Sequence, residues 1–288
     1  MNGVNSLNDS ATDLRKHRTV IRPRTGWIPV RWHELWHYRG LLWAFTSRDI
    51  KVRYKQTLLG FSWAALQPIM SMVVFTVIFG KLAGFDSLTG DVPYQLVVMA
   101  GILPWSFFQG ALGRAGNSLV ANQSIVTKVY FPRLWIPLSS LGSGMVDFLI
   151  ALFVLFLLMM YYGFYPSVSS LLIPVVMLGI ACLSVGIGMI FSAIIVKVRD
   201  FGMVLSYITT FWMYLTPVMY PAEVVSEKWR WLLDFNPMYG YINCFRSILL
   251  EQPMNWISLF YSVGFSILFL VVGLFYFTRV EKNFADVV

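Results

Sequence analysis

Long apolar runs, separated by shorter polar segments, dominate the pattern along this chain. Six of the runs come close to the roughly 20 residues that a helix needs to cross the hydrocarbon core of a bilayer. We expect transmembrane helices at residues 58–79, 94–113, 137–161, 171–196, 201–219 and 256–277. The pattern therefore predicts an all-α integral membrane protein whose six-span domain covers residues 58–288.

Residues 31–57 precede the first span and carry a different pattern. On a helical wheel, apolar side chains cover one half, and His33, His37 and Gly40 take the other half. The apolar half holds Trp32, Leu35, Trp36, Tyr38, Leu42, Trp43 and Phe45. This predicts an amphipathic interface helix followed by a basic connection, and the helix either lies in the membrane interface or packs against the spans. Residues 1–30 are polar and basic, which predicts a flexible cytoplasmic tail.

The segment between the fifth and sixth spans is too apolar to be an ordinary loop. Pro217, Pro221, Pro237 and Pro253 divide it into pieces of about ten to fifteen residues. Pieces of this length are too short to cross a bilayer, yet they carry many aromatic and leucine side chains. We expect short re-entrant or interfacial helices there.

Positive charge is distributed unequally between the two sides of the predicted bundle. Of the 22 Lys and Arg residues, 18 fall in alternate segments that include both termini, and four fall in the other set. Positively charged loops remain cytoplasmic, so we expect both termini on the inner side. Eleven of the basic residues precede the first span, where anionic inner-leaflet lipid explains them and nucleic acid need not be invoked.

The overall composition agrees with this class. The chain is 57% hydrophobic and only 12% charged, against about 25% charged in ordinary soluble domains. Six spans and their connections leave no stretch for a soluble catalytic domain. Redox chemistry finds no support, because two cysteines cannot build a metal cluster.

An H-E-x-x-H motif at His33, Glu34 and His37 is the one sign of an enzyme. In zinc proteases, two histidines four residues apart bind Zn²⁺ and the glutamate acts as general base. Here the motif precedes every span and the third histidine, His17, lies in the polar tail, so an amphipathic-helix coincidence is the simpler interpretation. The sequence has no G-x-x-x-x-G-K-[ST] phosphate loop. We therefore expect no enzyme activity, no metal and no cofactor in this chain.

Two charged residues fall within or at the end of predicted spans. Asp147 sits about ten residues into the third span, and Arg114 lies at the inner end of the second. An ionisable residue at such depth is a functional hypothesis by default. A role in transport and an Asp147–Arg114 pair that holds two helices together both remain open.

The fifth predicted span carries aromatic side chains at helical spacing. Tyr207, Phe211 and Tyr214 fall at i, i+4 and i+7, and Trp212 is adjacent. Such a row packs against neighbours or lipid in most helices. In a pore, however, the rings would offer flat apolar surfaces and polar edges that suit sugars. We treat these four residues as candidate channel aromatics.

Three sets of residues, in order along the chain, form a pattern that is specific as a set. The first comprises Arg48 to Thr57, then Leu59-Gly60 and Trp63 through Gln67-Pro68. The second comprises Asn122, Lys128 and Phe131-Pro132-Arg133. The third comprises Thr216-Pro217-Val218, Tyr220-Pro221, Lys228-Trp229-Arg230, Asn236-Pro237 and Phe245-Arg246. Together they resemble the ABC-2 type exporter permeases, and most closely the polysaccharide branch that exports O-antigen and capsule (the Wzm type).

The resemblance implies a homodimer with a channel at its interface and two cytoplasmic ABC ATPase subunits, which bind ATP and Mg²⁺. It implies that an inner loop transmits the nucleotide-driven movement through Asn122, Lys128, Phe131, Pro132 and Arg133. It also implies that the outer segment gates the exit, with Pro217, Tyr220, Trp229, Trp231, Asn236 and Pro237 as candidate residues. The expected substrate is a lipid-linked polysaccharide, carried from cytoplasm to periplasm across the bacterial inner membrane.

Two alternatives remain open. Within transport, the chain could serve another lipid-linked polymer such as teichoic acid. In a different class, it could be a membrane zinc protease that uses His33, Glu34 and His37.

Overall fold

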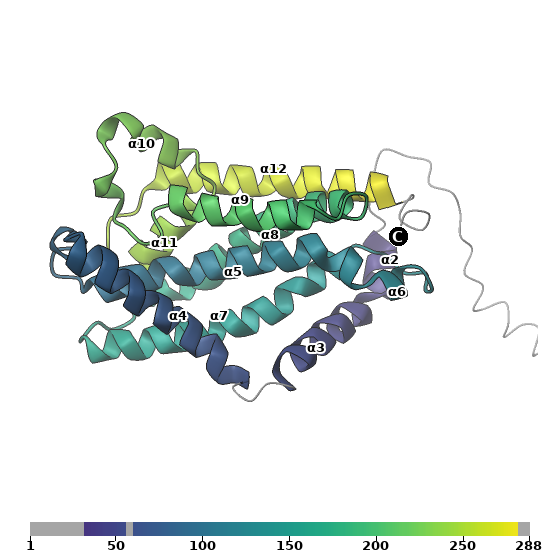
Figure 1. The fold of residues 1–288 in the computed structure, drawn as a ribbon, viewed down its shortest axis with the longest axis horizontal. Helices are drawn as coiled ribbons and strands as arrows, with labels where there is room; N and C mark the ends of the chain where they lie inside the picture. Colours follow the sequence, from purple (N-terminus) through teal and green to yellow (C-terminus); the bar gives the residue numbers. More distant parts are fainter. Residues whose placement is uncertain (1–31, 56–59, 282–288) are drawn as a thin grey trace, which may run out of the picture.

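The computed structural model describes residues 32–55 and 60–281, which form an elongated bundle of helices (Figure 1). Described residues contain no β-strand. The predicted tail at 1–30 lies outside the described residues. In chain order the long helices are α3 (Arg39–Lys55), α4 (Gly60–Phe75), α5 (Tyr94–Ala121), α7 (Trp135–Tyr161), α8 (Ile173–Ile195), α9 (Phe201–Leu215) and α12 (Trp256–Val280). The shorter helices are α2 (Trp32–His37), α6 (Gln123–Val126), α10 (Glu227–Asp234) and α11 (Tyr239–Leu250). The π-helical segment η1 (Thr76–Leu82) continues α4, the 3₁₀ turn η3 (Val168–Leu172) leads into α8, and the 3₁₀ turns η2 (Phe85–Leu88) and η4 (Ala222–Val224) lie in connections.

Five of the predicted spans appear as helices long and apolar enough to cross a membrane. Their bounds are Ser62–Leu82, Tyr94–Ala121, Trp135–Tyr161, Val168–Ile195 and Trp256–Val280. The protein is therefore a multi-pass membrane protein.

The fifth predicted span, 201–219, is shorter than expected. Helix α9 stops at Leu215 after 15 residues, which at 1.5 Å per residue is about 22 Å against a hydrocarbon core of about 30 Å. The physical reason is Pro217. A residue before proline avoids the helical region, and Thr216 is extended with φ −104° and ψ 134°.

Proline does not interrupt the first span in the same way. A proline inside a helix usually kinks or breaks it, whereas α4 continues through Pro68 as one helix. A membrane-spanning helix can contain proline because neighbouring helices and local adjustments satisfy the freed backbone groups. Past Phe75 the chain winds more widely as a π-helical turn, Thr76–Leu82.

Helix α5 is the centre of the bundle. It packs against α4, α7, α8, α9 and α11. In its most apolar stretch of 18 residues, 78% of the residues are buried. The corresponding share is 22% for both α4 and α12. Helices α4 and α12 therefore present most of their apolar surface outward, to lipid or to another protein.

Three glycines, Gly179, Gly186 and Gly188, allow α8 to approach its neighbours closely. A Cβ at Gly186 would lie 2.6 Å from backbone atoms of α12, and one at Gly188 would lie 2.5 Å from the Ala115 side chain on α5. A Cβ at Gly179 would lie 2.5 Å from the Tyr241 hydroxyl. Small residues at these positions bring the helix backbones into contact.

The helix that precedes the first span divides its apolar side chains between two environments. Leu35 and Phe45 are buried, and Phe45 packs against Phe131 with ring centroids 5.6 Å apart. By contrast, Trp36 and Trp43 are 70% and 74% exposed. Helix α3 lies along α7. Together α2 and α3 thus pack against the rest of the bundle on one side and expose Trp36 and Trp43 on the other, where such rings can enter the membrane interface.

Helix α11 is a short helix that lies inside the protein. It is buried along its length and contacts α5, α8 and α12. Its Arg246 is 6% exposed and donates hydrogen bonds to the carbonyls of Val97 at 3.1 Å, Pro217 at 2.9 Å and Val218 at 2.6 Å. The guanidinium therefore holds the turn after α9 against α5.

We predict that Gly273→Ala destabilises the bundle. Its Cβ would lie 2.2 Å from the carbonyl oxygen of Gly186, so α8 and α12 must separate at a cost of about 1–3 kcal/mol. The measurement is the midpoint of thermal unfolding of the purified protein in detergent. Gly264→Ala, on the same helix with no atom within 4 Å of the new Cβ, should not lower the midpoint. An equal effect of both substitutions would contradict the packing argument.

We predict a larger effect for Arg246→Met. The substitution leaves three buried carbonyl groups without their donor, which should cost more than about 3 kcal/mol. The readout is again the midpoint of thermal unfolding, together with protease cleavage between α9 and α11. The matched control is Arg230→Met on exposed α10, which should remain near the wild-type midpoint. Wild-type stability of Arg246→Met would show that the carbonyls find other partners.

Candidate functional site

The aromatic row on α9 lies on the surface of this chain. Tyr207, Phe211 and Tyr214 are 68%, 68% and 58% exposed. The opposite face of α9 rests on α5 and α8 through buried Leu205 and Thr209. Three large aromatic side chains in a row thus form an uncovered apolar face, which we call the α9 aromatic face.

Trp212 does not belong to this face. Its ring packs edge-on against Trp105 and Phe108 of α5, with centroids 6.3 and 5.1 Å apart. Its indole Nε1 donates to Asn236 Oδ1 at 3.0 Å. The structure therefore separates Trp212 from the other three candidate channel aromatics: it is half-buried and packs against the core.

Asn236 connects α9 to the outer segment. Its Oδ1 also accepts from the backbone N–H of Met238 at 3.1 Å, and its Nδ2 donates to Thr216 Oγ1 at 2.8 Å. Asn236 and Trp212 were both candidates on sequence grounds, but for separate roles. Their hydrogen bond links the end of the aromatic helix to the chain that leads into α11.

The remaining candidate gate residues differ in exposure. Pro217 is buried, Pro237 is half-buried, and Trp229 and Trp231 on α10 are 54% and 57% exposed. Tyr220 donates its phenol hydrogen to the Tyr214 carbonyl at 3.1 Å, and burial raises the pKa of this phenol. Helix α10 therefore lies exposed at this end of the bundle, next to the buried turn 216–219 and α11 (Figure 1).

The opposite end of the bundle gathers the elements of the predicted coupling site. Figure 1 places α2, α6 and the end of α12 there together. Phe131 is buried, Pro132 is half-buried, and Arg133 donates to the Glu281 carbonyl at 2.6 Å. Lys128 is exposed at the tip of the loop. The loop is thus anchored at its base and open at its tip.

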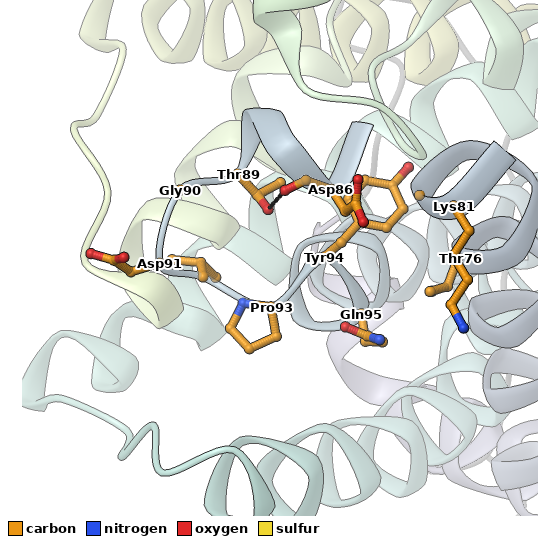
Figure 2. A pocket seen from close by; sticks show the side chains of 11 residues that line it. Thr76, Lys81, Asp86, Thr89, Gly90, Asp91, Pro93, Tyr94 and Gln95 are labelled. Atoms are coloured by element: carbon orange, nitrogen blue, oxygen red, sulfur yellow. Dashed lines mark hydrogen bonds between the residues drawn. The ribbon is translucent and has the colours of Figure 1, made fainter. Parts of the chain in front are cut away.

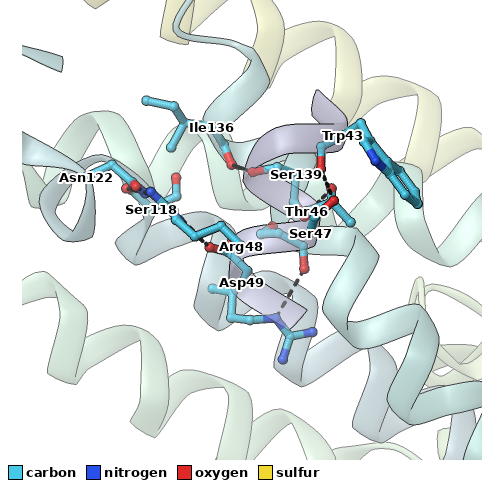
Figure 3. A network of polar contacts seen from close by, with 11 residues as sticks. Trp43, Thr46, Ser47, Arg48, Asp49, Ser118, Asn122, Ile136 and Ser139 are labelled. Atoms are coloured by element: carbon cyan, nitrogen blue, oxygen red, sulfur yellow. Dashed lines mark hydrogen bonds and ion pairs between the residues drawn. The ribbon is translucent and has the colours of Figure 1, made fainter. Parts of the chain in front are cut away.

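Asn122 ties this loop to α3, as Figure 3 shows. Its Oδ1 accepts from Arg48 Nη2 at 2.7 Å, while its Nδ2 donates to the Ser118 carbonyl at 2.8 Å. The same Arg48 guanidinium pairs with Asp49 at 2.8 Å. Thr46 Oγ1 donates to the Ser139 carbonyl of α7 at 3.4 Å. The base of the loop is therefore connected to α3 by a hydrogen bond.

A polar cavity of about 380 Å³ lies between α4, α5 and α7 beside the end of α3. Its charged residues are Arg53, Arg114 and Asp147. Asp147 pairs with Arg53 Nη2 at 2.8 Å and accepts a hydrogen bond from the Tyr54 hydroxyl. Of the two possibilities that the sequence leaves open for Asp147, the pair with Arg114 does not form in this structure, because α3 brings Arg53 to the carboxylate. Burial, followed by the hydrogen bond to Asp147, raises the pKa of the Tyr54 phenol.

A second cavity, of about 270 Å³, lies at the other end of α4 and α5 (Figure 2). Its polar residues are Thr76, Lys81, Asp86, Thr89, Asp91, Tyr94 and Gln95. Tyr94 donates its hydroxyl to the Met219 carbonyl. This hydrogen bond ties the start of α5 to the turn after α9.

The two histidines of the H-E-x-x-H motif lie at the surface of the described structure. His33 and His37 are exposed, and His17 lies outside the described residues. Within residues 32–55 and 60–281, no three His, Cys, Asp or Glu side chains lie together as a metal site. Cys182 and Cys244 are both free.

Arg246 is a residue that sequence reasoning placed only within a family motif. Its signal is a single basic residue in an apolar piece between two prolines. That pattern can indicate a buried cation, but it cannot reveal which carbonyls the cation binds.

Comparisons with known proteins agree with this arrangement. The family model described as ABC-2 type transporter matches residues 40–250. An O-antigen export system permease protein RfbA from Klebsiella pneumoniae is 31% identical over 251 residues, covering 86% of this chain and 94% of the relative. The RfbA permease of Myxococcus xanthus is 30% identical over 224 residues, covering 77% and 84%. The polysialic acid transport protein KpsM of Escherichia coli is 25% identical over 245 residues, covering 83% and 93%. This chain belongs to the ABC-2 type transporter family.

Proposed function

We propose that this chain is the transmembrane subunit of an ABC exporter that moves a lipid-linked polysaccharide from cytoplasm to periplasm. The observation that carries the proposal is the similarity to O-antigen export permeases over 86% of this chain. The α9 aromatic face supplies the matching chemistry, because aromatic rings bind sugars by stacking on their C–H faces while hydroxyls bond their edges.

In this proposal the chain crosses the bacterial inner membrane six times. Helix α9 is too short to span as a helix alone, and the buried turn 216–219 completes its path. Helix α11 then re-enters the protein as a short helix. Because α2 and the end of α12 lie at one end of the bundle, an even number of crossings fits, and the excess of basic residues assigns that end to the cytoplasm.

The working unit in this proposal is a homodimer. Tyr207, Phe211 and Tyr214 would face the partner subunit across a shared conduit, and their exposure on a single chain supports this. A polar polymer needs a path that lipid does not line, and two copies of the α9 aromatic face would enclose one. Helix α10 of each copy would close the periplasmic mouth.

Two cytoplasmic ATPase subunits would drive the movement and would bind the ATP and Mg²⁺. The loop tip offers them Lys128, Val129 and Tyr130, of which Val129 and Tyr130 are 58% and 54% exposed. Its base reaches α3 through Asn122 and Arg48. A push on the loop would therefore reach the helix that leads into the first span.

Teichoic acid and other lipid-linked polymers would use the same arrangement and differ in the sugar or lipid that is recognised. The similarity to export permeases favours transport over a zinc protease.

Deleting the gene tests the proposal directly. We predict that completed polysaccharide accumulates inside the deletion strain and that surface polysaccharide is lost, because the polymer has no other path outward. The measurement is fractionation of cells followed by detection of the glycan. Normal surface polysaccharide in the deletion strain would overturn the proposal.

The aromatic face can be tested in the same strain. We predict that Phe211→Ala combined with Tyr214→Ala lowers surface polysaccharide at least about tenfold, because two stacking surfaces are lost, while the protein still assembles with its ATPase. The matched control is Phe260→Ala combined with Phe275→Ala on α12, whose rings are 78% and 44% exposed. Equal export by the two double variants would show that the α9 aromatics only contact lipid.

A further inference from the structure

The cavity between α4, α5 and α7 has an unbalanced charge. Of its three charged residues, Arg53 and Asp147 neutralise each other through their 2.8 Å ion pair. Arg114 is left as the excess positive charge. The remaining polar lining consists of Gln67, Ser71, Ser106 and Gln109, which supply neutral donors and acceptors. The cavity as a whole favours an anion.

Arg114 is held so that part of its guanidinium stays available. Its Nε donates to the Ser140 carbonyl at 3.1 Å. Among the described residues, no acceptor forms a hydrogen bond with either Nη atom of Arg114. A guanidinium is costly to leave unbonded at this depth in a membrane protein. The two Nη groups therefore mark a place where an acceptor outside the protein can bind.

Two glycines make room for these Nη groups. A Cβ at Gly110, on the preceding turn of α5, would lie 3.0 Å from Arg114 Nη1. A Cβ at Gly144 of α7 would lie 2.2 Å from Arg114 Nη2. Both glycines line the cavity. The absence of side chains at two positions on two helices thus sets where the guanidinium sits.

We propose that this cavity binds a phosphate group carried on a membrane lipid, with Arg114 as the residue that contacts the phosphate oxygens. A guanidinium forks onto two phosphate oxygens at once, which a free Nη pair allows. Gln109 and Ser106, from the turns of α5 that precede Arg114, can add hydrogen bonds to the same group.

A lipid, and not a soluble anion, fits the position of the site. Arg114 lies seven residues before the end of α5, so it is about 10 Å along the helix from that end by the 1.5 Å rise per residue. The α4 wall of the cavity belongs to a helix that is mostly exposed to the membrane. An anion attached to an apolar chain can reach this depth laterally, whereas a free anion must first leave water at high cost.

Two lipids carry the required chemistry. One is a polyprenyl diphosphate, the type of carrier that a lipid-linked polysaccharide would bring, and this identification rests on the proposed function. The other is an anionic phospholipid of the surrounding membrane. Both present phosphate oxygens on an apolar anchor, so the test must separate them.

The test is native mass spectrometry of the purified full chain with four probes at equal concentration: a polyprenyl diphosphate, the uncharged polyprenol of the same length, phosphatidylglycerol and inorganic pyrophosphate. We predict that the wild type retains the polyprenyl diphosphate and that Arg114→Gln retains at least about tenfold less, because charge-assisted hydrogen bonds are lost. Arg114→Lys should bind at an intermediate level, since it keeps the charge and loses the fork.

Glycine variants give an independent test that keeps Arg114 in place. Gly144→Ala and Gly110→Ala should reduce retention of the polyprenyl diphosphate because each new Cβ displaces the guanidinium. Gly113→Ala is the matched control on the same helix, since no atom lies within 4 Å of its Cβ, and it should bind as the wild type does. Unfolding midpoints measured alongside identify any variant that loses lipid by losing its fold.

The probes decide the source of the phosphate. Equal, Arg114-dependent retention of phosphatidylglycerol supports a phospholipid site, and selective retention of the polyprenyl diphosphate supports a carrier site. Equal retention of polyprenol or of inorganic pyrophosphate overturns the proposal, as does wild-type retention by Arg114→Gln and Gly144→Ala. The gene-deletion experiment is separate: normal export in the deletion strain would overturn the proposed function and leave a phospholipid site intact.

Discussion

Satisfying backbone carbonyls inside a membrane protein is the constraint on which the rest of this structure depends. After α9 the chain turns within the buried part of the bundle, and a turn leaves carbonyls without helical donors. Arg246 supplies donors to Pro217 and Val218 and, through Nε, to Val97 of α5. One buried guanidinium thus holds a short helix, a turn and a second short, buried helix together.

That arrangement determines what lies on the surface. Because α9 ends early and its last turn is tied down by Trp212 and Asn236, its outer face cannot rotate into the core. The rings of Phe211 and Tyr214 therefore stay exposed. At the other end, Phe131 and Phe45 fix the loop base while the loop tip stays open. The rigid middle of the bundle separates two surfaces, each suited to a different partner.

The sequence predicts much of the fold because its strongest signal is local. Apolar runs of about 20 residues identify spans with little help from context, and five of the six appear at the expected places. The exception is α9, which ends early because Thr216 precedes Pro217. A hydropathy pattern does not show where a helix ends within an apolar run. The small residues of α8 were also predictable, because Gly186 and Gly188 stand out in an apolar helix.

Candidate site residues were less predictable, because pairwise contacts between distant segments decide them. A helical wheel groups Trp212 with its neighbours on α9, but the rings of Trp105 and Phe108 on α5 draw it inward. The chemistry of Asp147 likewise depends on Arg53 and Tyr54, 94 and 93 positions away in sequence.

The position of Arg53 has a consequence for the charge of the whole cavity. Had Asp147 paired with Arg114, the intramembrane charges would have cancelled and left an exposed Arg53 at the edge. Because α3 delivers Arg53 to the carboxylate, the uncompensated charge moves inward to Arg114. Helix α3 is also the helix that Arg48 ties to the inner loop. A displacement of α3 that pulled Arg53 from Asp147 would free the carboxylate to attract Arg114, and the anion site would lose its charge. In the proposed coupling, the helix that would receive movement from the loop would therefore also set whether the cavity favours an anion.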